Sequence, residues 1–227
     1  EISNLNFNGN NDKRPNKQGL FHNTCPGGQF FRGASLRFNR VGGVCLSLMD
    51  TLDCKIDQWY AQSCTGDVIK ATWSGQKIGV WDHSTAIELS NFNAQHCTGG
   101  MVLNLPRCGQ SLIHNGWIEH TEHPGDISDG QWIIDALSLE DCKNPLIAHN
   151  SRLNMRQTNL QSGSWIDNSL QGKPWLSMWE MGSTRVESYG VAIDGSLKYN
   201  YITSRFRLSN NTNQETWFEL GNFYSPT

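Results

Sequence analysis

The feature that most constrains the fold is the dipeptide Asp194-Gly195, which separates two strand-like runs. The runs, 175–193 and 196–208, are rich in β-branched and aromatic residues. Asp-Gly between two such runs is a strong signal for a two-residue type I′ turn, because both central residues of that turn need a positive φ. The turn predicts an antiparallel hairpin at the centre of a sheet, with Ile193 opposite Ser196 and Ala192 opposite Leu197.

A second hairpin is predicted around Asn115-Gly116, because this dipeptide also favours a type I′ turn. The flanking residues would then form two short paired strands in which Ile113 and Ile118 are cross-strand partners on one face. The opposite face of this hairpin would carry Leu112, His114, Trp117 and Glu119.

Short alternating runs separated by Gly, Asn and Asp predict further strands elsewhere in the chain. Residues 132–142 can form a helix, with Asp129 as its cap and Pro145 after its end, although a strand fits the pattern almost as well. Residues 50–66 are predicted to form a pinned loop or a short helix. No internal repeat is apparent. Together these patterns predict a single all-β domain over residues 1–227, an antiparallel β-sandwich or jelly roll with at most one or two short helices.

Seven cysteines lie at positions 25, 45, 54, 64, 97, 108 and 142. None of them forms a Cys-x-x-Cys pair, which argues against a zinc ribbon or a thioredoxin-like redox site. Scattered cysteines in a loop-rich chain are typical of disulfides, here about three bridges with one thiol left to pair with another segment. The prediction is therefore a disulfide-stapled, extracellular or secreted protein, and the Asn210-Asn-Thr sequon is a candidate glycosylation site.

Charge and motifs exclude several classes of protein. Charged residues are 17% of the chain and the formal net charge is −3, so nothing indicates a nucleic-acid partner. No apolar run reaches the roughly 18 residues of a membrane-spanning helix. A phosphate-binding glycine loop and a nucleophile elbow are also missing, so no cofactor is expected.

The densest group of ionisable residues is the segment 117–126, which contains two histidines and three carboxylates. His-x-Glu-His spacing matches neither common zinc motif, and strand alternation would place His120 and Glu122 on the opposite face from Glu119 and His123. The segment is therefore interpreted as solvated turn residues, and no metal site is predicted.

The chain contains nine tryptophans and many asparagines. Tryptophan offers a flat face for the CH side of a sugar ring, and the asparagine amide both donates and accepts hydrogen bonds to hydroxyls. Trp175 and Trp179 lie four residues apart, on one face of the predicted strand, where they suit neighbouring sugars of a glycan.

Glu180 and Glu187 are candidate catalytic residues, because glycoside hydrolysis needs two carboxylates about 5–10 Å apart. The stretch Val186–Gly190, Val-Glu-Ser-Tyr-Gly, resembles a segment of the family 11 xylanases, which are Trp-rich jelly rolls of low charge. The resemblance implies cleavage of a polysaccharide by paired carboxylates. It covers five residues; the strands that carry the catalytic pair of that family are not recognisable here, and the seven cysteines are foreign to it.

Two functions follow from these observations. The first is a binding module for a glycan or a cell-surface receptor, with contacts from His114, Trp117, Glu119, Trp175 and Trp179. The second is a secreted polysaccharide hydrolase or lyase that uses Glu180 and Glu187. A cleft with tryptophans and paired carboxylates favours the enzyme, whereas a shallow surface bearing tryptophan favours the binding module.

Overall fold

The computed structural model describes residues 1–11, 13, 20–22, 28–75, 83–144, 146–148, 151–156 and 159–160, together with five short strands beyond residue 175. Every regular element in these residues is a β-strand. The predicted helix at 132–142 is therefore wrong, since these residues mostly belong to a strand, and so is the loop or helix at 50–66, most of which forms another strand. No helix that could span a bilayer occurs in the described residues.

The strands form two sheets, which we call sheet A and sheet B. Sheet A consists of β1 (Ile2–Asn8), β3 (Arg32–Asn39), β5 (Leu52–Gln62), β7 (Thr85–Gln95), β9 (Ser111–Glu119), β11 (Gln131–Glu140), β13 (Arg152–Arg156), β14 (Asn159–Leu160), β16 (Val186–Tyr189), β17 (Ala192–Asp194), β18 (Phe206–Ser209) and β19 (Glu215–Phe218). Sheet B consists of β2 (Phe21–His22), β4 (Leu46–Met49), β6 (Ile69–Thr72), β8 (Met101–Asn104), β10 (His123–Asp126), β12 (Leu146–Ile147) and β15 (Leu176–Ser177).

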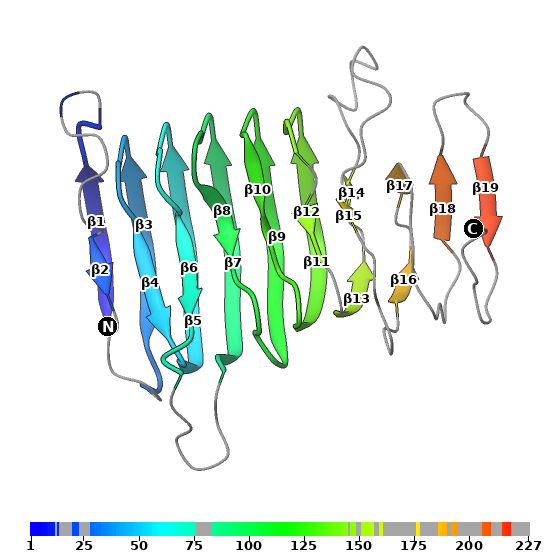
Figure 1. Cartoon of the computed structure of the whole chain (residues 1–227), viewed down its shortest axis with the longest axis horizontal. Helices are drawn as coiled ribbons and strands as arrows, with labels where there is room; N and C mark the ends of the chain where they lie inside the picture. The colour runs from blue at the N-terminus through cyan, green and yellow to red at the C-terminus, as the bar shows by residue number, and fades with distance from the viewer. Residues whose placement is uncertain are drawn as a thin grey trace.

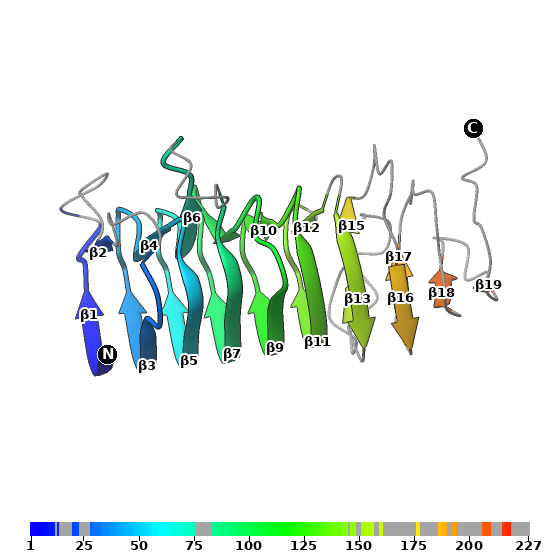
Figure 2. The ribbon, with the colours of Figure 1, turned by 90° about the horizontal axis from the view of Figure 1, so that it is seen from below.

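The chain passes repeatedly from one sheet to the other, as Figures 1 and 2 show. From β2 to β12, each coil of the chain adds one strand to each sheet, and every neighbouring pair is parallel; β18 and β19 are the one antiparallel pair among the described strands. Parallel neighbours need a crossover connection, and here the strand of the opposite sheet supplies it. The architecture is a parallel β-helix.

This architecture contradicts the predicted antiparallel sandwich or jelly roll. Asn115-Gly116 lies inside β9 and does not reverse the chain. Ile193 pairs with Leu160 and Leu208, not with Ser196, which lies outside the described residues. Alternation of apolar and polar residues identifies a strand but carries no information about the direction of its partner, and this is why the prediction failed.

A row of left-handed residues bends the strands of sheet A at mid-length. Their φ values lie between 50° and 55°, and each is skipped in the pairing register: Asn4, Ser35, Gln58, Asn91, Asn115 and Ala136. Asn115 therefore has the positive φ that its turn signal predicted, but Gly116 does not. Asparagine tolerates this conformation unusually well, so an Asn-Gly pair can mark a bend in one strand as well as a hairpin.

The bend also changes which side chains face outward. On a regular strand Gly116 would share a face with His114, since side chains alternate. With the left-handed residue between them, Ile113, Gly116 and Ile118 point into the coil, where both isoleucines are buried. His114 and Trp117 are exposed on the outside.

The interior is filled by rows of apolar side chains at equivalent positions of successive coils. In one row Trp59 and Phe92 stack with ring centroids 4.3 Å apart and planes 6° apart. Gly116 is the next member, and a Cβ there would lie 2.3 Å from the Phe92 ring. The missing side chain therefore makes room for the aromatic stack.

The six described cysteines are free and buried, so the predicted disulfide framework is wrong for this part of the chain. Cys64, Cys97 and Cys142 follow the ends of β5, β7 and β11 at equivalent inward positions, and their thiols donate to carbonyl groups of the corners. Burial raises the pKa of Cys54 to about 12 and that of Cys142 to about 11, which keeps these thiols protonated and unreactive. Cys25 and Asn210 lie outside the described residues.

The coils also constitute the internal repeat that the sequence did not reveal. One inward position of sheet A recurs at Gly33, Ile56, Leu89, Ile113 and Ile134. The spacing varies because connections of different length separate the strands, so no fixed period is visible. The assignment of residues 1–227 to a single domain stays a prediction.

Candidate functional site

The predicted contact residues His114, Trp117 and Glu119 lie on the outer face of sheet A. Next to the bend, one row of outward side chains crosses five neighbouring strands, and we call it the Trp117 row. Its members are register partners of one another: Arg37, Tyr60, Asn93, Trp117 and Ser138. Trp117 is 41% exposed, which is unusual for so large an apolar side chain.

A shallow groove of about 520 Å³ follows the bend between β5 and β11. From β5 to β11, members of the Trp117 row and of the left-handed row line the groove, together with Trp59 and Phe92 of the interior. The lining residues are Gln58, Trp59, Tyr60, Asn91, Phe92, Asn93, Asn115, Gly116, Trp117, Ala136 and Ser138. The groove thus combines aromatic rings with side-chain amides.

Hydrogen bonds between neighbouring coils hold the amides in place. Asn115 Nδ2 donates to Asn91 Oδ1 at 2.8 Å, and Asn91 Nδ2 donates to Asp57 Oδ1 at 2.8 Å. Ser90 Oγ also donates to Asp57 Oδ1, at 2.9 Å. Although burial by itself raises the pKa of Asp57, the hydrogen bonds from Asn91 and Ser90 hold that pKa below its usual value. The ionised form of the Asp57 carboxylate, which accepts from the groove residue Asn91, is therefore favoured.

A second group of polar side chains lies at the ends of the same strands. Tyr60 OH donates to Gln95 Oε1 at 3.1 Å, and Gln95 Nε2 in turn donates to Glu119 Oε1. Glu140 on β11 is the register partner of Glu119 on β9. Parallel strands lie about 4.8 Å apart, so the backbones of these two glutamates are neighbours, two residues beyond the Trp117 row.

The corner that follows these strands carries a stack of imidazoles. The rings of His96 and His120 lie parallel with centroids 5.1 Å apart, and His120 Nδ1 is 2.8 Å from Asp141 Oδ2. Glu119 Oε2 lies 3.9 Å from His120 Nε2. In the part of the chain that the structure describes, no group of three or more His, Cys, Asp or Glu residues is arranged to hold a metal ion.

Comparison with known proteins gives two strong similarities. The chain is 72% identical over 226 residues to the amylovoran biosynthesis protein AmsF of Erwinia amylovora. It is 80% identical, with a TM-score of 0.70 over 92% of its length, to the solved structure of Pantoea stewartii WceF, described as a glycan biofilm modifying enzyme with a bacteriophage tailspike-like parallel β-helix fold. The fold is therefore tailspike-like. No protein-family model matches the chain.

The chain spans 30% of the length of each of these two proteins, although both similarities cover nearly all of the chain itself. Both relatives are therefore considerably longer than this chain. One is named for amylovoran biosynthesis and the other for modifying a glycan biofilm.

The structure brings three of the predicted contact residues together. His114, Trp117 and Glu119 all lie on the outer side of β9, and His114 Nδ1 is 3.3 Å from Asp135 Oδ2 on β11. All three residues belong to one strand, so the sequence alone could predict that they lie close together, although the predicted hairpin is wrong.

The other predicted site residues are not placed together. Trp175, Trp179 and Glu180 lie outside the described residues. Glu187 lies in β16, where its backbone is in register with Asn154 of β13. Their roles as sugar platforms and catalytic carboxylates stay predictions.

Several residues of the site were missed by the sequence analysis, among them Tyr60 and Asn91, which line the groove, and Glu140, the register partner of Glu119. They are far from Trp117 in sequence and become its neighbours only through the register of the coils. The segment 117–126, interpreted as turn residues, is instead divided between β9, a corner and β10. Two of its members have structural partners, since Glu122 Oε2 accepts from Gly99 N at 3.0 Å and His123 Nδ1 lies 3.0 Å from Asn144 Nδ2.

Proposed function

We propose that this segment provides a glycan-binding face within a longer protein that acts on an extracellular polysaccharide. The observation that carries the proposal is the exposed ring of Trp117 at the edge of a groove lined by amides. Sugar rings stack on aromatic faces, and their hydroxyls pair with groups that both donate and accept.

The spacing of the aromatic rings supports a polymer as the ligand. Tyr60 and Trp117 belong to the same outward row, two strands apart, which corresponds to about 10 Å along the coil axis. Asn93 lies between them in the row. A chain of several sugars can therefore contact both rings and the intervening amide at once.

The relatives support an exopolysaccharide in particular. AmsF is named for amylovoran biosynthesis, and WceF is described as a biofilm glycan modifying enzyme. We infer that the ligand of this face is a bacterial exopolysaccharide of the same kind, met outside the cell. The names of the two relatives give no support for a protein receptor. A segment joined through a cysteine has no support either, because the described cysteines are buried free thiols.

The test is the affinity of the protein for amylovoran, measured by titration calorimetry before and after Trp117→Ala. Loss of the stacking ring is expected to weaken binding by about 10- to 100-fold, because one aromatic platform contributes about 1–3 kcal/mol. Phe30→Ala is the matched control, since Phe30 is an exposed aromatic residue (65%) that does not line the groove. Equal affinity for wild type and Trp117→Ala would refute the proposed role of the groove.

A second candidate function is cleavage of the glycan, favoured by the register pairing of Glu119 with Glu140. Retaining glycosidases hold their two carboxyl groups about 5–5.5 Å apart, close to the spacing of adjacent strands. If this pair is catalytic, Glu119→Gln or Glu140→Gln should abolish release of reducing ends from amylovoran while binding persists. Unchanged release in both variants would exclude this pair and leave Glu180 and Glu187 as the carboxylates to test.

A further inference from the structure

A second pocket, of about 480 Å³, lies where the chain enters the strands of sheet A, and we call it the corner pocket. It is lined by His83, Arg107, Gly109, Asp129 and Gln131. These residues come from three successive coils, because they precede or begin β7, β9 and β11. None of them lines the groove beside Trp117.

Backbone hydrogen bonds fix the walls of the corner pocket. Gly109 N donates to Ser84 O at 2.9 Å, and Arg107 N donates to Ser128 O at 2.8 Å. Gln131 N donates to Cys108 O at 2.9 Å. The corners of the three coils are thereby held in register, so the lining side chains project from a rigid frame.

Gly109 keeps the pocket open. A Cβ at this position would lie 3.3 Å from Nε2 of the His83 ring and 3.5 Å from Oγ1 of Thr85. This is tighter than an ordinary carbon contact, so a larger residue would press against the imidazole and occupy part of the space.

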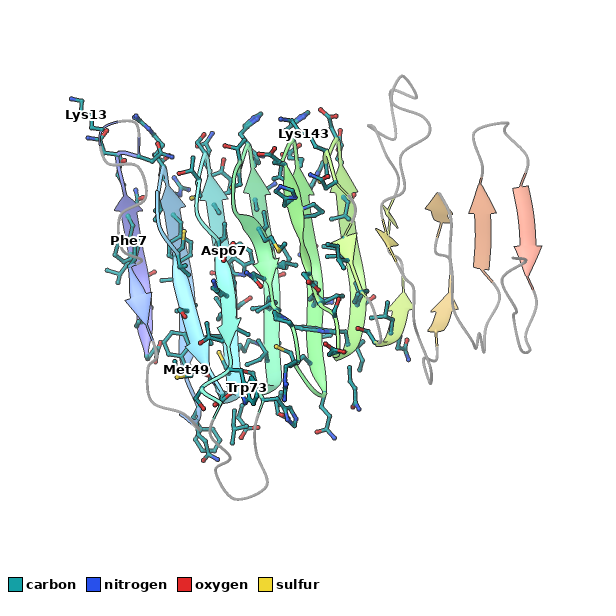
Figure 3. All side chains as sticks on the ribbon, viewed as in Figure 1. Phe7, Lys13, Met49, Asp67, Trp73 and Lys143 are labelled. Carbon is teal, nitrogen blue, oxygen red and sulfur yellow. The ribbon has the colours of Figure 1, made fainter. Side chains whose placement is uncertain are left out.

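An exposed tryptophan adjoins the pocket through Arg107. The Arg107 guanidinium lies 4.3 Å from the centroid of the Trp73 ring, and Trp73 is 51% exposed. The buried Asp50 carboxylate anchors the following residue, since Asp50 Oδ2 accepts from both N and Oγ of Ser74. Figure 3 shows Trp73 at the lower edge of the sheets and Lys143 at the upper edge. A large aromatic surface is thus held in place beside polar side chains.

We propose that the corner pocket binds a second sugar unit of the polysaccharide that occupies the groove. Guanidinium, carboxylate, amide and imidazole groups together offer donors and acceptors in planar arrangements, which match the vicinal hydroxyls of a sugar. The pocket has the volume of a small-molecule site. This inference rests on the proposed function, because it assumes that the protein holds a glycan.

The two sites are close enough to share one polymer. Gln131 in the corner pocket and Ala136 in the groove lie on the same strand, β11. Five residues of extended chain span about 17 Å. Simultaneous contact makes the second binding event intramolecular, so a long glycan gains affinity that a short one does not.

The experiment compares amylovoran with a short oligosaccharide prepared from it, using the protein, two test variants and one control variant. The double variant His83→Ala/Gln131→Ala removes polar groups of the corner pocket, and Trp117→Ala alters the groove. Lys143→Ala is the control, because Lys143 is exposed and lines neither site. Circular dichroism and the melting temperature establish that each variant is folded.

We expect the double variant to lose about tenfold in affinity for the polymer and to bind the short oligosaccharide as wild type does. Unchanged affinity for the polymer, with Trp117→Ala still impaired, overturns the corner site alone. If Trp117→Ala binds normally and the double variant is impaired, the groove assignment fails and the corner site stands. Competition by inorganic phosphate, with no effect of added methyl glycosides, would show an anion site and also overturn the proposal.

Discussion

The strands β5, β7 and β9 carry an inner and an outer row of side chains. The two rows are one residue apart in sequence and differ in burial and packing. The inner row contains the buried, stacked rings of Trp59 and Phe92 and the side-chain-free Gly116, whereas the outer row contains the more exposed Tyr60 and Trp117. Interior side chains are as closely packed as an organic crystal, so each depends on its neighbours. Outer side chains have fewer packing neighbours, so the outer row can serve binding at little cost to the core.

The largest expected effect is the difference between two tryptophans on opposite sides of these strands. Trp59→Ala should lower the free energy of unfolding by about 3–5 kcal/mol, because it leaves a cavity beside Phe92. Trp117→Ala should change it by less than about 1 kcal/mol, since the ring is largely in solvent. Urea unfolding followed by fluorescence measures both values. Similar losses in the two variants would show that the inner and outer rows are wrongly assigned.

A somewhat smaller effect is expected at Gly116, where the inner row has no side chain. Gly116→Ala should cost about 1–3 kcal/mol, because the new methyl group would overlap the Phe92 ring. The double variant Gly116→Ala/Phe92→Leu should be more stable than the sum of its single changes predicts, since the smaller side chain leaves room. Strict additivity in a double-mutant cycle would rule out the overlap as the cause.

Substitutions at the bend, which precedes both rows, should lower the stability less than those in the inner row. Asn115 has a φ of +50°, so Asn115→Ala is expected to cost about 1 kcal/mol through backbone strain and the lost bond to Asn91. Asn115→Gly loses the same hydrogen bond but adopts this φ readily, so it should be the milder change. The order of the two melting temperatures is the readout, and a lower value for the glycine variant would contradict the argument.

The smallest effect concerns the pH dependence of stability at Asp57 on the outer side. The folded-state pKa of Asp57 is below its ordinary value of about 3.9, so its stabilising contribution is present above that pH. The contribution is lost as the pH falls through the lowered folded pKa. Asp57→Asn should therefore flatten the decline in melting temperature below about pH 4. An identical decline in wild type and variant would mean that Asp57 is not stabilised by Asn91 and Ser90.

Much of the local structure follows from the sequence. The alternation of Ile69 and Ala71 with Lys70 and Thr72 predicts a strand, and the structure has β6 there with the apolar pair buried. The pairing of the strands could not be predicted in the same way. A parallel partner lies a whole coil away in sequence, and the connections differ in length, so the repeat is masked.

Only the part of the candidate site that lies on one strand could be predicted from the sequence. His114, Trp117 and Glu119 share the outer side of one strand, and the polar and aromatic pattern of nearby residues was sufficient to select them. Tyr60 and Glu140 were not predictable, because each belongs to a different coil, and only the register places Tyr60 in the row of Trp117 and Glu140 beside Glu119. A search for equivalent positions in successive strands would have found them once the fold was known.

The sequence by itself determined several of the strands, such as residues 69–72, and which of their side chains avoid water, because both properties depend on neighbours within a few positions. Only the tertiary structure decided that Asn115 bends a strand instead of reversing it, and that the six described cysteines are buried free thiols. The physical reason is that strand direction and register are chosen by packing between coils, and those contacts join residues that no short sequence window contains.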